Sequence, residues 1–233
     1  MQSGHTRGFS RSYGKRPPAV QLSRRAALWL ALGALLTPAA AAERPVRIVV
    51  LGDSLSAGFG LAVQDALPAK LEKALKAKGL PVEIANAGVS GDTAAGGLAR
   101  LDWSVPEGTD AVILELGAND ALRGADPKAT HAALEGIIRK LKERKIEILL
   151  AGMLAPRNLG PDYSAAFDAI YPELAAEHGL ILYPFILDGV AGDAALNQAD
   201  GLHPTAAGVD IMVSRILPRA EELVARVRAA RGS

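Results

Sequence analysis

The chain has 233 residues, of which 49% are hydrophobic, and it carries 26 lysine and arginine side chains against 25 aspartate and glutamate side chains. It contains no cysteine, which excludes disulfides, thiol nucleophiles and metal sites built on cysteine. After removal of a short N-terminal segment, its length suits one domain with a full-sized core.

The first 42 residues differ in composition from the rest and predict an export signal. They hold six basic and no acidic residues, and an apolar run over 26–36 precedes an A-x-A cleavage site in 37–42. A secretory signal has these parts in this order. An uncleaved anchor is the alternative, although a membrane-spanning helix needs about 20 apolar residues. We therefore expect a signal peptide over 1–42, a working domain over 43–233, and an exported protein, periplasmic or secreted, with no stable membrane anchor.

The route of export is left open by the sequence. The pair Arg24-Arg25, after a long basic region, resembles a twin-arginine signal, but Ala27 stands where a bulky apolar residue is expected. The general secretory route is the alternative. Both routes place the mature protein outside the cytoplasm.

The charge of the mature domain differs from that of the whole chain. Without residues 1–42, 20 basic and 25 acidic residues remain, so the net charge is about −5. A mildly acidic domain without a basic cluster argues against nucleic acid as a partner.

From residue 46 onward, short apolar runs alternate with segments of helical periodicity. The predicted strands are 46–51, 82–85, 111–116, 146–151 and 180–183, and the predicted helices are 66–78, 127–144, 163–178 and 205–230. This alternation indicates right-handed βαβ crossovers. We expect an α/β protein, a three-layer α/β/α sandwich with about five parallel strands.

Small polar loops follow the first three predicted strands, where open parallel sheets bind their ligands. The first loop begins "GDS" at Gly52, the second is "NAGVSGDT" over 86–93, and the third is "GAND" over 117–120. Turn and capping preferences explain each loop taken alone. Their joint placement at one sheet edge is what indicates a site.

Ser54 in the first loop is a candidate nucleophile, and a serine nucleophile needs a base that is oriented by an acid. His203 lies in "DGLHP", three residues after Asp200, and this span lets a carboxylate meet the ring nitrogen that faces away from the serine. The spacing alone is weak evidence, because Asp-x-x-His occurs often by chance.

The other histidines have structural explanations. His5 belongs to the predicted signal, His131 lies in the polar start of a predicted helix, and His178 lies at a helix end, where a cation suits the dipole.

A phosphate-binding role for the first loop is disfavoured. Gly58 and Gly60 follow a strand and match the start of G-x-G-x-x-G, with Glu83 further on, but Val63 occupies the third small position. No Gly-Lys-Ser/Thr follows, so a nucleotide P-loop is absent.

Four blocks in this order, "GDSLSAG", "NAGVSGDT", "GAND" and "DGLHP", resemble those of the GDSL or SGNH hydrolases over residues 46 to about 217. The segments "SGDTAAGGLARL", "ELGANDALRG" and "FDAIYPELA" resemble more specifically the bacterial periplasmic arylesterase, lysophospholipase and acyl-CoA thioesterase I group. Ala118 departs from the pattern, since a second glycine is expected there. The resemblance implies the flavodoxin-like SGNH hydrolase fold.

The resemblance implies a catalytic triad in which Ser54 is the nucleophile, His203 the general base and then acid, and Asp200 its orienting partner. Ser54 is not in the G-x-S-x-G elbow of α/β-hydrolases, because position 56 is serine.

The implied oxyanion hole consists of the backbone N–H groups of Ser54 and Gly91 and the side-chain amide of Asn119. Gly88 is a rival for the second donor, although the alignment of "SGDT" favours Gly91.

The expected activity is hydrolysis of carboxylic esters and thioesters through an acyl-enzyme, without metal or cofactor. The substrates would be small acyl esters or thioesters, with lysophospholipids among the candidates, and segment 154–163 resembles the loop that flanks the acyl site. The first alternative is a carbohydrate acetylesterase of the same fold. The second is a non-catalytic acyl-binding protein, against which the presence of the complete residue set argues.

Overall fold

The computed structural model describes residue 14 and residues 44–232. The chain divides into two units, Met1–Ala42 and Glu43–Ser233, and the fold described below is that of the second. Apart from residue 14, the predicted signal peptide lies outside the described residues. In the described part, no helix has both the length and the apolar character needed to cross a membrane.

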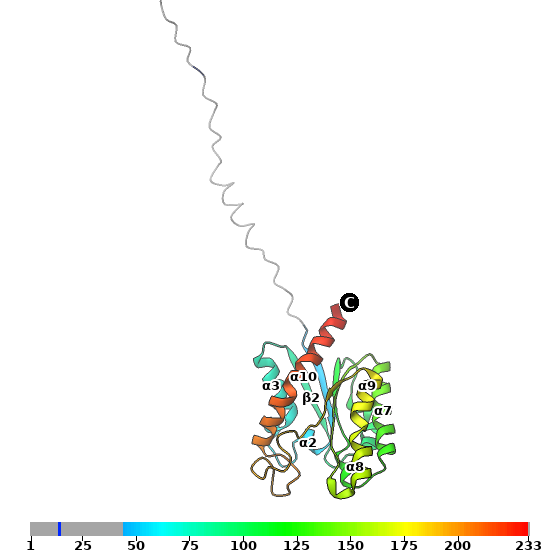
Figure 1. Cartoon of the computed structure of the whole chain (residues 1–233). Coiled ribbons are helices and arrows are strands. Elements are labelled where there is room, and N and C mark those ends of the chain that lie inside the picture. The colour runs from blue at the N-terminus through cyan, green and yellow to red at the C-terminus, as the bar shows by residue number, and fades with distance from the viewer. Residues whose placement is uncertain (1–13, 15–43, 233) are drawn as a thin grey trace, which may run out of the picture. The chain divides into compact units, whose positions relative to one another are not determined.

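The domain is built on one parallel sheet of five strands (Figure 1). The strands are β1 (Val46–Gly52), β2 (Val82–Gly88), β3 (Ala111–Glu115), β4 (Glu147–Ala151) and β5 (Ile181–Tyr183). Their order in the sheet is β2-β1-β3-β4-β5, and every neighbouring pair is parallel. This is the flavodoxin-like strand order. The prediction of a doubly wound α/β sandwich with five parallel strands is confirmed.

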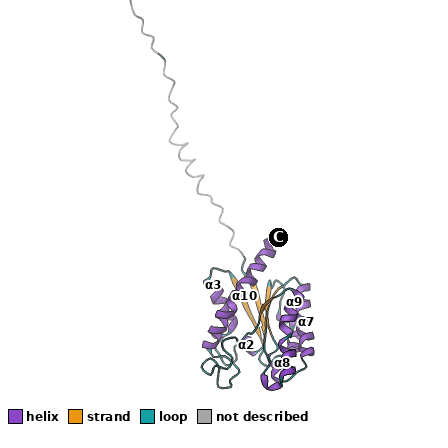
Figure 2. Cartoon of the chain, in the orientation of Figure 1, coloured by secondary structure: helices purple, strands orange, loops and turns teal. Residues whose placement is uncertain are grey.

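Helices cover both faces of the sheet (Figure 2). On one face, α3 (Leu67–Ala77) packs against α10 (Ala206–Gly232). On the other face, α7 (Pro127–Glu143) contacts α4 (Ala94–Ala99) and α9 (Ile170–His178). The shorter elements are α2 (Ser54–Ala57), α5 (Leu101–Ser104), α6 (Ala118–Leu122), α8 (Pro161–Asp168) and the 3-10 turns η1 (Val63–Asp65) and η2 (Arg157–Leu159).

The long helices follow the apolar spacing that predicted them. In α3 the buried side chains include Leu67, Leu71 and Leu75, four residues apart, which form one apolar stripe against the sheet. Helix α7 begins where expected because the Asp126 side chain accepts a hydrogen bond from the Lys128 N–H and proline occupies the first helical position.

The predicted single helix over 163–178 was wrong, because two helices, α8 and α9, meet at Ala169. Pro172 has no N–H to donate to the carbonyl of Asp168, so the helical ladder is interrupted there. The side chain of Asp168 lies at the end of α8. Its carboxylate accepts hydrogen bonds from the Ala155 N–H at 2.8 Å and from Arg157 Nη1 at 2.6 Å. The Asp168 side chain thereby ties the loop that follows β4 to the end of α8.

The sheet also creates a crevice at one edge. Strand β1 pairs with β2 on one side and with β3 on the other, so the chain leaves β1 and β3 in opposite directions across the sheet. Ligands bind at such switch points, beyond the carboxyl ends of the strands. The loops after β1 and β3 contain Ser54 and Asn119, and both therefore lie at this crevice.

Candidate active site

Ser54 is the first residue of α2 and follows β1 after one intervening residue. The side chain of that residue, Asp53, caps the helix by accepting a hydrogen bond from the Leu55 N–H at 3.0 Å. The helix ends at Gly58, whose φ of +79° favours glycine, and a Cβ there would lie 2.6 Å from that of Ala66. This tight strand-turn-helix connection places Ser54, which is 8% exposed, at the carboxyl edge of the sheet.

The structure brings Ser54, His203 and Asp200 together in one chain of hydrogen bonds. Nε2 of His203 lies 2.9 Å from Oγ of Ser54, and Nδ1 lies 2.7 Å from Oδ2 of Asp200. The other carboxylate oxygen of Asp200 accepts the backbone N–H groups of Leu202 at 2.9 Å and His203 at 3.0 Å. Both oxygens of the acid are therefore occupied, and the imidazole is held in a fixed orientation.

These contacts also keep Asp200 ionised. The backbone N–H of His203, the His203 side chain and the backbone N–H of Leu202 lower the pKa of Asp200 to about 2. An ionised acid at Nδ1 favours the tautomer that carries its proton there. Nε2 is then free to accept the Ser54 hydroxyl proton.

The loop that contains the acid and the base is tied to the loop that contains the serine. Gln198 Nε2 donates to the carbonyl oxygens of Phe59 at 2.7 Å and Pro204 at 2.9 Å, and the Gln198 backbone N–H donates to the carbonyl oxygen of His203 at 2.7 Å. The ring of Phe59 packs on the imidazole, with centroids 4.4 Å apart. Gln198 and Phe59 thus support the contact between the two loops.

The structure distinguishes the two glycines considered as backbone donors. The N–H of Gly88, inside β2, already donates to Oδ1 of Asn86 at 2.9 Å. A Cβ at Gly88 would collide with the backbone of Ala57, so this glycine lets α2 pack on the strand. Among the described residues, the N–H groups of Gly91 and Ser54 have no hydrogen-bond partner. Gly91 therefore has a free donor, and Gly88 does not.

The Asn119 side chain lies between the loops that follow β1 and β2. Its Nδ2 donates to the carbonyl oxygen of Asp92 at 2.9 Å and, through a longer contact, to Oδ2 of Asp53 at 3.3 Å. The short bond anchors the amide next to Gly91. The longer bond is the weaker of the two and leaves one N–H that a better acceptor can recruit.

Arg100, whose role was not predicted from the sequence, connects these loops through hydrogen bonds. Its buried guanidinium donates to the carbonyl oxygens of Gly52 at 2.8 Å and Ala87 at 2.7 Å, and to the Asp92 carboxylate at 2.6 Å. Such charge-assisted bonds are stronger than neutral ones. One cation thereby fixes the ends of β1 and β2 and the loop that contains Gly91.

Two buried carboxyl groups, those of Asp53 and Glu115, lie near the turn that contains Ser54. Glu115, at the end of β3, accepts hydrogen bonds from Oγ of Ser56 at 2.6 Å and from the Asp53 N–H at 3.3 Å. Burial, with the neighbouring Asp53 charge, raises the pKa of Glu115 well above its usual range. Burial also raises the pKa of Asp53 to about 6, opposed by its bond to the Leu55 N–H and by His203.

The raised pKa of Asp53 predicts a pH-dependent stability. Its folded-state pKa of about 6 exceeds the ordinary 3.8, so the folded state binds more protons between these values. The contribution of Asp53 to the free energy of unfolding should therefore fall as the pH rises from about 4 through about 6. Urea unfolding at a series of pH values should show a shallower decrease in Asp53→Asn than in the unsubstituted protein. Equal slopes in the two proteins would contradict the assignment.

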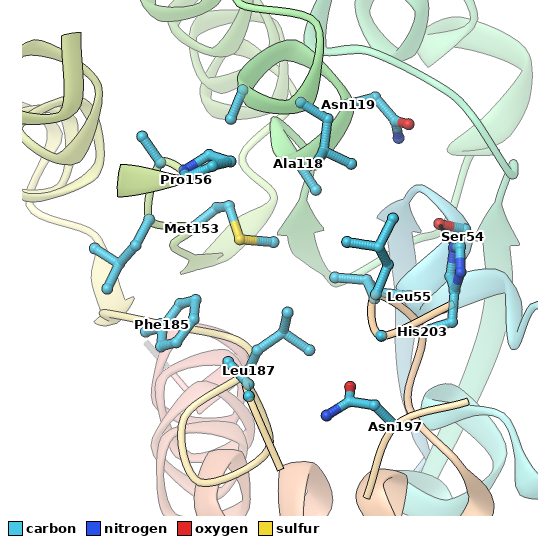
Figure 3. A pocket seen from close by; sticks show the side chains of 18 of the residues that line it. Ser54, Leu55, Ala118, Asn119, Met153, Pro156, Phe185, Leu187, Asn197 and His203 are labelled. Atoms are coloured by element: carbon cyan, nitrogen blue, oxygen red, sulfur yellow. Dashed lines mark hydrogen bonds between the residues drawn. The ribbon is translucent and has the colours of Figure 1, made fainter. Parts of the chain in front are cut away.

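A cavity of about 750 Å³ opens beside Ser54 and His203 (Figure 3). Figure 3 shows Leu55 next to the serine and Met153, Phe185 and Leu187 across the cavity. The volume is in the range of small-molecule sites, and the lining is mainly apolar. This space suits a hydrocarbon chain attached to a group at Ser54.

Two further features named from the sequence, segment 154–163 and Ala118, can be located relative to the cavity. Residues 154–157, the first part of the predicted flanking segment, line the cavity, and Ala118 forms part of its wall. Ala118 stands where a glycine is expected, so a methyl group is present at this point of the cavity wall.

The described residues include one cluster of side chains of the types that bind metal ions, and it lies away from the cavity. In the part of the chain that is described, one group of three ligand-type side chains occurs, formed by Glu135, Glu177 and His178 on α7 and α9. Glu135 is already paired with Arg139. None of these residues lines the cavity. His131 and His178 both lie in helices, as their structural explanations expected.

Comparison with known proteins gives concordant matches. The model of the GDSL-like lipase/acylhydrolase family matches residues 50–211. The chain is 39% identical over 191 residues to Esterase TesA of Pseudomonas aeruginosa, which covers 82% of this chain and 94% of the relative. It is 40% identical over 158 residues to the Escherichia coli K12 protein named thioesterase 1/protease 1/lysophospholipase L1, covering 67% and 74% of the two chains.

A solved structure matches as well. The crystal structure of AlinE4, described as an SGNH-hydrolase family esterase, superimposes with a TM-score of 0.66 at 46% identity. The match covers 77% of this chain and 96% of that one.

Proposed function

Because the chain belongs to the GDSL-like lipase/acylhydrolase family and is a carboxylic ester hydrolase, we propose that Ser54 is its nucleophile, His203 its general base and Asp200 the group that orients this base. The observation that carries this assignment is the hydrogen-bonded chain from Ser54 Oγ through the imidazole to Asp200, at 2.9 and 2.7 Å, beside an apolar cavity. The expected substrates are small acyl esters and thioesters, since the two relatives are named as an esterase and as a thioesterase.

In the acylation step, Ser54 Oγ attacks the carbonyl carbon while Nε2 of His203 takes the hydroxyl proton. The imidazolium is stabilised by the ionised Asp200 at Nδ1. It then gives the proton to the leaving oxygen or sulfur as the bond to the acyl carbon breaks. The product is an acyl group on Ser54 and a free alcohol or thiol.

The negative charge of the tetrahedral intermediate would be stabilised by three donors, the N–H groups of Ser54 and Gly91 and the Asn119 amide. The first two N–H groups have no partner among the described residues, so they need no rearrangement. Asn119 would exchange its 3.3 Å contact with Asp53 for the oxyanion and retain its bond to Asp92. Preorganised donors of this kind are each worth about 3 to 4 kcal/mol on deletion.

Deacylation repeats these steps with water. His203 accepts a proton from a water molecule that attacks the acyl carbon, and the same donors stabilise the second tetrahedral intermediate. The imidazolium returns the proton to Ser54 Oγ as the carboxylic acid leaves. The enzyme is restored without a metal ion or a redox cofactor in any step.

The apolar cavity supports an acyl chain longer than acetyl as the preferred group. A rate series with p-nitrophenyl esters of two to twelve carbons, matched acyl thioesters and an acetylated sugar tests this. We expect kcat/KM to rise from two carbons to a medium chain, because each added methylene group moves from water into the apolar cavity. Full burial of one methylene group contributes about 0.8 kcal/mol of binding free energy.

The same series contains the outcome that would contradict this substrate class. If the acetylated sugar has the highest kcat/KM and longer chains are excluded, the protein is a carbohydrate acetylesterase. An unreactive protein that still binds fatty acids would instead be an acyl-binding protein on a hydrolase scaffold.

We further propose that the enzyme is exported, with residues 1–42 as its signal. The support is the composition of that segment, namely six basic residues, an apolar run and small residues before 43. N-terminal sequencing of the protein recovered from the periplasm tests the cleavage site. A mature protein that begins at residue 1 would contradict it.

A further inference from the structure

The large apolar side chains exposed on the described part of the chain are gathered at one edge of the sheet. Seven such side chains are at least 37% exposed, and six of them follow the carboxyl end of a strand. These six form what we call the apolar rim: Phe59, Val63, Val89, Leu122, Leu159 and Leu202. The seventh, Trp103, lies on α5.

Every connection at this edge contributes to the apolar rim. Phe59 and Val63 follow β1, and Val89, Leu122, Leu159 and Leu202 follow β2, β3, β4 and β5 in turn. Among the described residues, the large apolar side chain exposed outside this edge is that of Trp103 on α5. Single exposed apolar residues are ordinary, but their concentration around a site marks an interaction surface.

The apolar rim is continuous with the active-site cavity. Leu122 and Leu202 line the cavity and are also 50% and 48% exposed, so each belongs to both surfaces. Phe59 is 48% exposed while its ring packs on His203. A hydrocarbon chain can therefore pass from a surface in contact with the apolar rim to Ser54 without crossing a polar barrier of side chains.

Two cations adjoin the apolar rim. Arg123 follows Leu122, and Arg157 precedes Leu159 by two residues and lines the cavity. Both side chains are exposed, and each uses only part of its guanidinium, Arg123 on the Gly91 carbonyl oxygen and Arg157 on Asp168. Guanidinium groups bind phosphate well. Apolar side chains with flanking cations are typical of proteins that bind at a phospholipid interface.

From these observations we propose that the apolar rim docks reversibly on the surface of aggregated phospholipid. The aliphatic side chains enter the boundary of the acyl chains, and Arg123 and Arg157 lie against phosphate groups. This inference rests on the proposed function, because docking would place the cavity entrance at the surface from which an acyl substrate leaves. It makes the enzyme a peripheral interfacial protein.

Binding to vesicles of phosphatidylcholine with phosphatidylglycerol tests the docking surface without any turnover. Ser54→Ala protein is mixed with the vesicles and the bound fraction is measured by sedimentation. Adding Val63→Ser and Leu159→Ser should lower the partition coefficient about tenfold, because two aliphatic side chains no longer leave water. The matched control is Trp103→Ser, which removes a side chain that is 73% exposed but lies outside the apolar rim and should leave binding unchanged.

Further results of these measurements decide the question. Equal binding by the rim variant and its parent, or an equal loss in Trp103→Ser, would overturn the proposal. If sedimentation velocity instead shows a dimer that the rim substitutions dissociate and no vesicle binding, the surface pairs two copies of this chain and the lipid proposal is wrong. Val63→Ser alone, at a side chain that is 85% exposed, should give part of the loss and guards against misfolding of the double variant.

A separate activity measurement tests the proposed function. With Ser54 intact, Val63→Ser should hydrolyse a short soluble ester within twofold of the unsubstituted protein, because Val63 does not line the cavity. If the unsubstituted protein binds vesicles but hydrolyses no soluble ester, the proposed function fails while the docking surface stands.

Discussion

Replacement of Ser54 by alanine is expected to lower kcat/KM for a short p-nitrophenyl ester by about 10⁴-fold or more. The substitution removes the atom that would form the acyl-enzyme, and the remaining donors can only assist attack by water. Among the described residues, the Ser54 hydroxyl is hydrogen-bonded to His203 only, so the thermal unfolding of the variant should stay close to that of its parent.

A fluorophosphonate probe gives an independent readout of the same serine. The unsubstituted protein should be labelled at Ser54, and Ser54→Ala should not be labelled. Ser214→Ala, on the exposed face of α10, is the matched control and should keep both activity and labelling. Ester turnover that persists in Ser54→Ala would exclude this serine as the nucleophile.

Replacement of Asn119 by alanine is expected to lower kcat by about 10²- to 10³-fold and to change KM little. The amide would donate to the oxyanion, which exists in the tetrahedral intermediates and not in the bound ester. A loss confined to binding would raise KM instead and would contradict the role. Steady-state kinetics with one medium-chain ester separates these outcomes.

The control for Asn119 must address its structural contacts. Its amide also binds the Asp92 carbonyl oxygen and Asp53, so the melting temperature of Asn119→Ala should be measured beside its kinetics. Asn158→Ala, at an exposed position of η2, removes an amide outside the site and should retain full kcat. If both variants lose activity equally, the effect of Asn119 is not specific.

Periodicity in the sequence was sufficient for the sheet and for most helices, because buried strands and amphipathic helices each impose a spacing on apolar residues. It failed at Pro172, where the apolar pattern continues across 163–178 while the missing N–H interrupts the backbone ladder. A proline at that point of the pattern was the available signal.

The site was predicted in part, because the blocks around Ser54, Asn119 and His203 each follow a recognisable element. The supporting residues were not identified. Glu115 is an acid in an otherwise apolar strand, and Arg100 ends a small-residue helix, and these contrasts could have indicated buried polar roles. The distinction between Gly88 and Gly91 needed the structure, because it depends on which N–H is already bonded.

The three bonds of Arg100 to Gly52, Ala87 and Asp92 separate the parts of the molecule that can be redesigned from those that cannot. The loops after β4 and β5, which form much of the cavity wall, make none of these bonds. Enlarging or reshaping the cavity for another acyl group is therefore a matter of residues 153–157 and 185–192, and such changes leave the spacing between the donors intact. Evolution and protein engineering have the same freedom here, because residues 153–157 and 185–192 can change the acyl selectivity while the proposed catalytic groups, on the loops after β1, β2 and β3 and at residues 200–203, stay as they are.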